Sequence, residues 1–173
     1  MEYNISNLKN NRRGFTLIEL LLYTVIAAGL LLAITAMIAL LTQSRVKNQT
    51  INMVEQQGAQ ILQLLSQEIR NSVVVISPTN ESGGTTLQLQ DFSGQNITFD
   101  ISSNTLRETK LGQTVTLSSN SLLVSDLQFL NLTPDNTHNS IKINFTLSYN
   151  NIAGRTEYNY SQTFYGTATL RQP

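Results

Sequence analysis

The sequence predicts an α+β protein in which one long N-terminal α-helix packs against an antiparallel β-sheet domain. Three observations indicate this class. Residues 20–41 form an uncharged apolar run, residues 46–69 repeat apolar side chains at three- and four-residue spacing, and the chain after Ser77-Pro78 consists of short alternating runs rich in Thr, Ile, Val, Phe and Tyr. A long helix followed by roughly seven or eight short strands fits one antiparallel sheet packed on one helix. The length of 173 residues suits a single globular domain.

The apolar run is long enough to cross a membrane. As an α-helix its 22 residues span about 33 Å, against about 30 Å for the hydrocarbon core of a bilayer. Lys9, Arg12 and Arg13 precede the run, and Arg45 and Lys47 are the first basic residues after it. The excess of positive charge on the N-terminal side favours a cytoplasmic N-terminus, with the C-terminal domain outside the cytoplasm.

Three membrane interpretations compete. A secretory signal peptide should have a shorter apolar region, of about 7–15 residues, and a small-x-small cleavage site, whereas this run ends in Ile-Ala-Leu-Leu. A plain single-pass anchor explains the run but not Glu19, a carboxylate at its edge. A carboxylate costs about 2.5–3.5 kcal/mol at the membrane centre and less near the edge, so it is a functional hypothesis by default. Taken alone, Glu19 fits a marker of the membrane interface equally well.

The residues around Glu19 favour the third interpretation. The stretch Arg12-Arg13-Gly14-Phe15-Thr16-Leu17-Ile18-Glu19-Leu20 resembles the prepilin signal of the type IV pilin and type II secretion pseudopilin superfamily. The matching features are a short basic leader, Gly at the cut, Phe after it, Glu as the fifth residue of the product and a long apolar helix. The resemblance implies a pilin-like fold, with residues 1–14 as the leader peptide and residues 15–41 as the hydrophobic transmembrane and polymerisation half of the helix.

The same resemblance implies how the chain is processed and assembled. A membrane prepilin peptidase would cut between Gly14 and Phe15 on the cytoplasmic side, and the new amine of Phe15 would be N-methylated. Glu19 would then pair with the Phe15 amine of a neighbouring subunit. Two charges at about 4 Å attract by about 1 kcal/mol in water and about 4 kcal/mol at an effective dielectric of 20, and an unpaired charge in apolar surroundings is penalised further. Glu19 would therefore fix the axial register of assembly, and Gly14 has no Cβ to obstruct the peptidase.

The rest of the chain supplies the second half of the helix and the sheet. One helix is expected from about Phe15 to about Asn71, with residues 42–76 as its amphipathic second half and exit, and residues 77–173 as an antiparallel β-rich globular domain. Gly58 weakens this helix by about 1 kcal/mol relative to Ala and offers a place for a bend. Turns are expected at Gly83-Gly84 and at Ser102-Ser103-Asn104. Strands are expected at residues 85–90, 95–101, 105–108, 115–117, 122–124, 126–132, 141–149 and 157–170.

A second, looser resemblance concerns the class of subunit. It rests on Gln67-Glu68-Ile69-Arg70-Asn71, Pro78, Gly83-Gly84-Thr85-Thr86-Leu87 and the ending 167–171, which are similar to J-type minor pseudopilins and PilW-type minor pilins. This implies a structural minor subunit, at the tip or in the initiation complex of a type IV pilus or a type II secretion-like pseudopilus. The implied partners are other pilin or pseudopilin subunits, the prepilin peptidase, an inner-membrane assembly platform and, before assembly, membrane lipid.

Alternatives to a minor subunit stay open. The chain has no Cys, so it lacks the disulfide-closed C-terminal loop of many major pilins, which favours the minor class without excluding a major subunit. A tip adhesin or a DNA-uptake receptor could use the β-rich domain instead. The sequence does not distinguish a pilus from a secretion pseudopilus.

Composition argues against other chemistry. The formal net charge is +0 and 13% of residues are charged, which disfavours a nucleic-acid partner. With no Cys and a single histidine, His138, in a polar loop, zinc sites of the common type are excluded. The sequence contains neither a glycine-rich phosphate loop nor a Gly-x-Ser-x-Gly motif. We therefore expect no enzymatic activity, no cofactor and no metal, with a membrane-anchored hydrolase as the enzymatic alternative.

Two groups of polar or aromatic residues carry weaker alternatives. Calcium needs several convergent oxygens, and polar turns are expected rather than calcium at the residues that offer them: Asp135, Asn136 and Asn139 in one loop, and Asp91 with Asp100 around a hairpin. Aromatic side chains on strands are usually core or cross-strand residues. That is the expectation, with a partner-binding surface as the alternative, for Tyr149, Tyr158, Tyr160, Phe164 and Tyr165.

Overall fold

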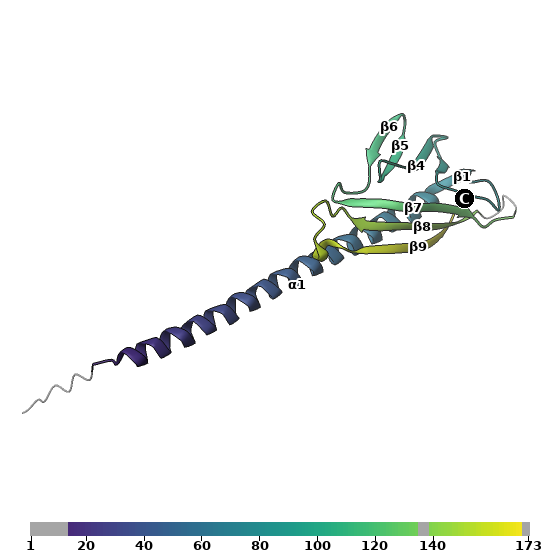
Figure 1. The fold of residues 1–173 in the computed structure, drawn as a ribbon. Coiled ribbons are helices and arrows are strands. Elements are labelled where there is room, and N and C mark those ends of the chain that lie inside the picture. Colours follow the sequence, from purple (N-terminus) through teal and green to yellow (C-terminus); the bar gives the residue numbers. More distant parts are fainter. Residues whose placement is uncertain (1–13, 135–138, 171–173) are drawn as a thin grey trace, which may run out of the picture. The chain divides into compact units, whose positions relative to one another are not determined.

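The computed structural model describes residues 14–134 and 139–170 of the chain. Within them the chain forms one long helix, α1 (Leu17–Asn71), followed by two antiparallel sheets, which confirms the α+β class (Figure 1). The predicted leader peptide lies outside the described residues except for Gly14. The chain divides into two compact units, Met1–Thr42 and Gln43–Pro173.

The part of α1 in the first unit exposes its whole surface. Every residue from Gly14 to Thr42 is exposed, and the large apolar side chains among them range from 51% exposed at Ile26 to 83% at Leu17. Each threonine in this part of the helix donates its hydroxyl to a carbonyl oxygen one turn earlier, at 2.8–2.9 Å: Thr24 to Leu21, Thr35 to Leu32 and Thr42 to Ile38. The hydroxyls are thus satisfied within the helix, as a membrane-spanning helix requires. The segment is long and apolar enough to cross a membrane.

From Gln43 onward α1 has one buried face. Its buried residues recur every three or four positions, at Thr50, Val54, Gly58, Ile61, Leu65 and Ile69. This is the amphipathic spacing predicted for the second half of the helix. The polar Thr50 is tolerated on this face because its Oγ1 donates a hydrogen bond to the carbonyl oxygen of Val46 at 3.0 Å.

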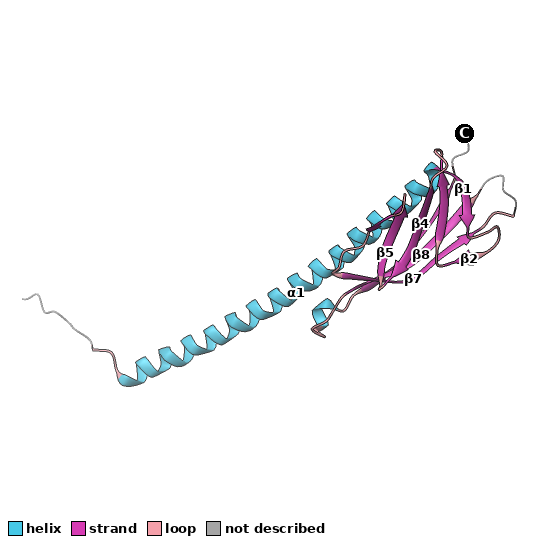
Figure 2. Cartoon of the chain, turned by 90° about the horizontal axis from the view of Figure 1, so that it is seen from above, coloured by secondary structure: helices cyan, strands magenta, loops and turns pink. Residues whose placement is uncertain are grey.

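The strands form two antiparallel sheets instead of the single sheet expected (Figures 1 and 2). The five-stranded sheet has the order β1-β3-β4-β5-β6, and the four-stranded sheet has the order β2-β7-β8-β9. The first contains β1 (Ser72–Ser77), β3 (Leu87–Asp91), β4 (Asn96–Ser102), β5 (Thr105–Lys110) and β6 (Gln113–Thr116). The second contains β2 (Gly83–Gly84), β7 (Leu122–Asn131), β8 (Ser140–Tyr149) and β9 (Ser161–Thr169). Buried side chains from α1 and from both sheets form one hydrophobic core.

Strand β1 is an element that the sequence analysis does not predict, because it assigns residues up to 76 to the helix and its exit. The chain passes from Asn71 in the helix directly to Ser72 in the strand. Residues 73–76 are all β-branched, and such side chains favour extended backbone. The strand pairs with β3, for example through Val75 and Leu89.

The prediction of a turn at Gly83-Gly84 is wrong. These two residues form the short edge strand β2, in which Gly83 pairs with Leu130 and Gly84 with Phe129 of β7. The Asn131 side chain holds this segment in place by donating to the carbonyl oxygen of Pro78 at 3.2 Å. The pairing partner is distant in sequence, so local turn propensity could not reveal it.

Further boundaries differ from expectation. The strand expected at 85–90 is β3 at 87–91, and the one expected at 115–117 is β6 at 113–116. The separate strands expected at 122–124 and 126–132 are one strand, β7, with an irregularity between Ser125 and Gln128 where Asp126 has φ 53°. The expected strand at 157–170 begins only at Ser161, after a short 3₁₀ helix, η1 (Thr156–Tyr158). The hairpin between β4 and β5 is confirmed, since Ser103 and Asn104 both have positive φ, as a tight two-residue turn requires.

Two glycines bring the helix and the four-stranded sheet close together. A Cβ on Gly58 would overlap the ring of Phe164 in β9, and a Cβ on Gly166 in β9 would lie 2.6 Å from Cδ1 of Leu62 in the helix. Phe164 also stacks on Phe145 of β8, with ring centroids 5.4 Å apart. Gly58 therefore has a packing role that the sequence analysis, which suggested a bend, did not anticipate.

Candidate functional site

The predicted cleavage site lies just before the helix. Gly14, Phe15 and Thr16 precede the first helical residue, Leu17, and all are exposed. A Cβ on Gly14 would have no heavy atom within 4 Å. The described part of the chain therefore gives no steric reason for glycine at this position. The peptide bond between Gly14 and Phe15 lies in non-helical, accessible backbone, the form in which a protease can bind it.

Thr16 caps the helix. The backbone N–H of Glu19 donates to Oγ1 of Thr16 at 3.3 Å and to its carbonyl oxygen at 3.1 Å, and the N–H of Leu20 donates to the same carbonyl oxygen at 3.1 Å. A threonine at the cap followed three residues later by glutamate is the sequence pattern of a capping box. This role of Thr16 was not predicted from the sequence, although the Thr-x-x-Glu spacing indicates it.

Glu19 lies in the first turn of α1, where a carboxylate interacts favourably with the positive end of the helix dipole. Its side chain is exposed. Among the described residues the ion pairs are Arg107–Asp100, Lys110–Asp91 and Arg155–Glu157, so none involves Glu19. Glu19 thus takes part in the helix cap through its backbone N–H, while its carboxylate lacks a cationic partner in the described chain.

Phe15 folds back along the helix. Its ring lies against the ring of Tyr23, with centroids 5.8 Å apart and planes tilted by 51°. Phe15, Glu19 and Tyr23 are spaced four residues apart, which places Glu19 and Tyr23 on the same side of the helix. The predicted site residues Gly14 and Phe15 lie directly before α1, and the third, Glu19, lies in its first turn.

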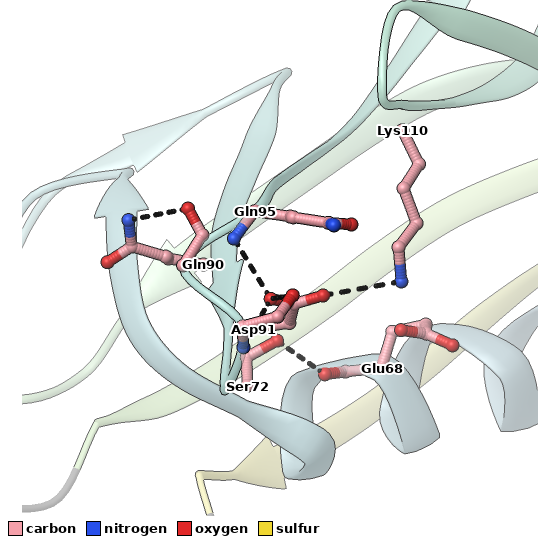
Figure 3. Close-up of polar contacts among 8 residues, drawn as sticks. Glu68, Ser72, Gln90, Asp91, Gln95 and Lys110 are labelled. Atoms are coloured by element: carbon pink, nitrogen blue, oxygen red, sulfur yellow. Dashed lines mark hydrogen bonds and ion pairs between the residues drawn. The ribbon is translucent and has the colours of Figure 1, made fainter.

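Asp91 and Asp100, two of the residues considered for calcium, have other roles in the structure. Oδ1 of Asp91 accepts hydrogen bonds from the N–H of Ser93 at 2.9 Å, the hydroxyl of Ser93 at 2.6 Å and the N–H of Gln95 at 2.9 Å. Its Oδ2 lies 3.5 Å from Nζ of Lys110 (Figure 3). The hydroxyl of Ser93, followed by the N–H of Gln95, lowers the pKa of Asp91 to about 2. This carboxylate fixes the turn between β3 and β4.

Asp100 is also engaged, in a two-point contact with Arg107 across β4 and β5, at 3.1 and 2.7 Å. Asp135, Asn136 and His138 lie outside the described residues. Asn139 is buried, and its Oδ1 has no hydrogen-bond partner among the described residues. Within the described ranges no group of three His, Cys, Asp or Glu side chains gathers to hold a metal ion.

The aromatic residues of the C-terminal strands mostly pack as expected. Tyr149 stacks on Tyr158 with ring centroids 5.0 Å apart, and Phe164 stacks on Phe145. The hydroxyl of Tyr160 lies 3.1 Å from Oε1 of Glu55. Tyr165 differs, because it is 64% exposed on the outer face of β9.

Comparison with protein-family models, curated proteins and solved structures finds no match to this chain.

Proposed function

We propose that this chain is a structural subunit of the minor pilin or pseudopilin kind, which assembles through the first half of its N-terminal helix into a type IV pilus or a type II secretion-like pseudopilus. The observation that carries the proposal is the exposed apolar segment of residues 15–42 with Glu19 near its start. Burial of apolar surface is the main driving force of folding and association, and a segment this apolar needs lipid or other helices around it.

Membrane insertion is the first step of this function. Residues 20–41 match the thickness of a bilayer core, at about 33 Å of helix. Their threonine hydroxyls bond to the helix backbone and so do not need water. The subunit would be held in the cytoplasmic membrane with its β-rich domain outside the cytoplasm.

Processing is the second step. A prepilin peptidase would cleave between Gly14 and Phe15, in the accessible backbone before α1, and the new Phe15 amine would be methylated. Thr16 remains after this cut and still provides the cap that starts the helix at Leu17. The cleaved chain therefore keeps the local structure that positions Glu19.

Assembly is the third step, and Glu19 is its specific element. Its charge has no cationic partner in the described chain, and its position four residues after Phe15 lets it meet the Phe15 amine of a neighbouring subunit. An unpaired carboxylate is costly among apolar helices. Only the packing register that pairs it relieves that cost, so the charge selects one register of helix on helix.

Mass spectrometry of the mature protein, isolated from membranes and from filaments, tests this proposal. The expected product starts at Phe15 and carries one methyl group on its amine. A chain that retains Met1, or one that has lost the whole apolar run, would overturn it. The first would show an unprocessed anchor, and the second an ordinary secretory signal.

A further inference from the structure

The segment between β8 and β9 carries an unusually exposed apolar side chain. Ile152 is 90% exposed, more than any other large apolar residue in the described ranges. A side chain of this kind gains free energy when it leaves water. The loop of residues 150–158 therefore presents an apolar tip to its surroundings.

The loop holds this tip in a fixed conformation. The side-chain nitrogen Nδ2 of Asn151 donates to the carbonyl oxygen of Arg155 and to Oδ1 of Asn159, both at 2.8 Å. The backbone N–H of Arg155 donates to Oδ1 of Asn151 at 3.0 Å. Gly154 supplies the positive φ, 63°, that the turn needs. Because the loop is organised in advance, little further ordering is required for Ile152 to make a contact.

The loop lies beside the first residues of the second unit. Thr156 and Glu157 line a hollow of about 330 Å³ together with Gln43, Ser44 and Lys47. In the sequence only Thr42 separates the apolar run 20–41 from Gln43, a distance of about 3 Å along a helix. When the run lies in a bilayer, the chain connection alone holds Gln43 at the bilayer edge, and the loop that lines a hollow with Gln43 is then within reach of the headgroups.

The charges at this end suit anionic lipid. Arg45, Lys47 and Arg155 are exposed, against the single carboxylate of Glu157, which lies 3.1 Å from the guanidinium of Arg155. These four residues have a net charge of +2, although residues 43–173 as a whole contain one more acidic than basic residue. Basic residues next to a membrane-spanning segment are attracted by anionic headgroups.

We propose that residues 150–155 and the basic residues Arg45 and Lys47 form a contact with an anionic lipid surface. Ile152 enters the headgroup region, and Arg155 binds lipid phosphates beside Arg45 and Lys47. The contact holds the β-rich domain against the membrane before assembly, and the subunit gives it up on entering a filament. The inference rests on the membrane-anchored state required by the proposed function.

The absence of cysteine makes the contact directly measurable, because each introduced cysteine is the only one to label. The full chain would be reconstituted into vesicles of phosphatidylcholine and phosphatidylglycerol as three single variants, Ile152→Cys, Ala33→Cys and Phe92→Cys, each carrying a nitroxide. Ala33 reports the apolar run. Phe92 is the matched control, since it is also an apolar side chain, 66% exposed. It follows Asp91, which pairs with Ser72, the residue directly after α1. The end of α1 is about 42 Å along the helix from Gln43.

Electron paramagnetic resonance would compare collisions of each label with oxygen, which dissolves in lipid, and with a water-soluble nickel chelate. We expect the ratio of oxygen collisions to nickel-chelate collisions to be several-fold higher at 152 than at 92, and highest at 33. The ratio at 152 should fall when phosphatidylglycerol is omitted. Equal ratios at 152 and 92, with 33 in lipid, would overturn the lipid contact and leave the proposed function standing. Shielding of the label at 152 only in assembled filaments would also overturn the lipid contact, because it would show a subunit interface. A label at 33 exposed to water would overturn the anchored state itself, and the inference with it.

Discussion

The ring of Phe164 in β9 occupies the space that a side chain at position 58 of α1 would need. The converse contact lies beside it, where Leu62 of the helix packs over Gly166 of the same strand. Each element thus offers a glycine to a large side chain of the other. This reciprocal arrangement lets the helix backbone approach the sheet more closely than two layers of side chains would allow.

Gly58→Ala is expected to destabilise the protein. Overpacking of a core costs about 1–3 kcal/mol, whereas replacing glycine by alanine in a helix gains at most about 1 kcal/mol. The ring of Phe164 cannot move freely to make room, since it is stacked on the buried Phe145. We expect a net loss of about 1 kcal/mol or more in the free energy of unfolding, measured by urea denaturation of the full chain in detergent.

A double mutant separates packing from backbone effects. In the Phe164→Ala background the space over position 58 is open, so Gly58→Ala should become neutral or stabilising through helix propensity. Gln56→Ala, on the exposed side of the same turn, serves as the control. If Gly58→Ala destabilises both backgrounds equally, the contact with Phe164 is not the cause.

These glycines also show how far sequence reasoning extends. The α+β class, the long helix and its buried face follow from periodicity, which is a local property of the chain, and all were predicted. The packing role of Gly58 depends on Phe164, more than 100 positions away, so the sequence alone suggested a bend. β2 was taken for a turn for the same reason, because its partners Phe129 and Leu130 are distant in the chain.

Other differences have local causes. β1 was missed because a helix and a strand are joined at Asn71 and Ser72 without a loop, so no turn residues mark the change. At the candidate site, Gly14, Phe15 and Glu19 were identified by resemblance. The Thr-x-x-Glu spacing indicates the cap formed by Thr16. This cap was not predicted, because Glu19 was interpreted only through its charge, as a residue of assembly.

The carboxylate of Asp91 should make stability sensitive to acid. Its pKa is lowered from 3.8 in its ordinary state to about 2, first by the Ser93 hydroxyl and then by the Gln95 N–H. A lowered pKa in the folded state contributes stability that is present above about pH 4 and is lost as pH falls to about 2. Asp91→Asn should therefore be less stable than the native chain at neutral pH, and the difference should vanish near pH 2. Denaturant titrations at several pH values measure this, and a pH-independent difference would contradict it.

Glu108 should behave in the opposite way. Burial, followed by the nearby carboxylate of Glu68 on α1, raises the pKa of Glu108. A raised pKa of an acid in the folded state means that the charged form costs stability above that pKa, and that the cost disappears below the ordinary value of 4.5. Glu108→Gln should therefore be more stable than the native chain at neutral pH, with no advantage in acid. Thermal unfolding at pH 7 and pH 4 checks this, and a destabilised variant at pH 7 would exclude the explanation.

Gly14→Leu should block processing without disturbing the chain. A side chain at position 14 meets no described atom within 4 Å, so the precursor should insert and fold normally. The bulky side chain should instead obstruct the peptidase, and the uncut precursor should accumulate at least tenfold on immunoblots of membranes. Gly14→Ala, which adds one methyl group, is the graded control. Normal cleavage of both variants would show that the peptidase does not read this position.

Glu19→Gln isolates the charge from the cap. Glutamine at this position can still take part in a capping box, and the backbone N–H that bonds to Thr16 is unchanged, so the helix should start at the same residue. The lost attraction to a partner amine is about 4 kcal/mol at an effective dielectric of 20. We expect normal insertion and normal cleavage before Phe15, with incorporation into filaments reduced at least tenfold.

Thr16→Ala is the complementary variant, because it removes the capping hydroxyl at a cost of about 1 kcal/mol in helix stability and keeps the charge. It should assemble nearly normally, so a stronger assembly defect in Thr16→Ala than in Glu19→Gln would assign the role of Glu19 to the cap rather than to register.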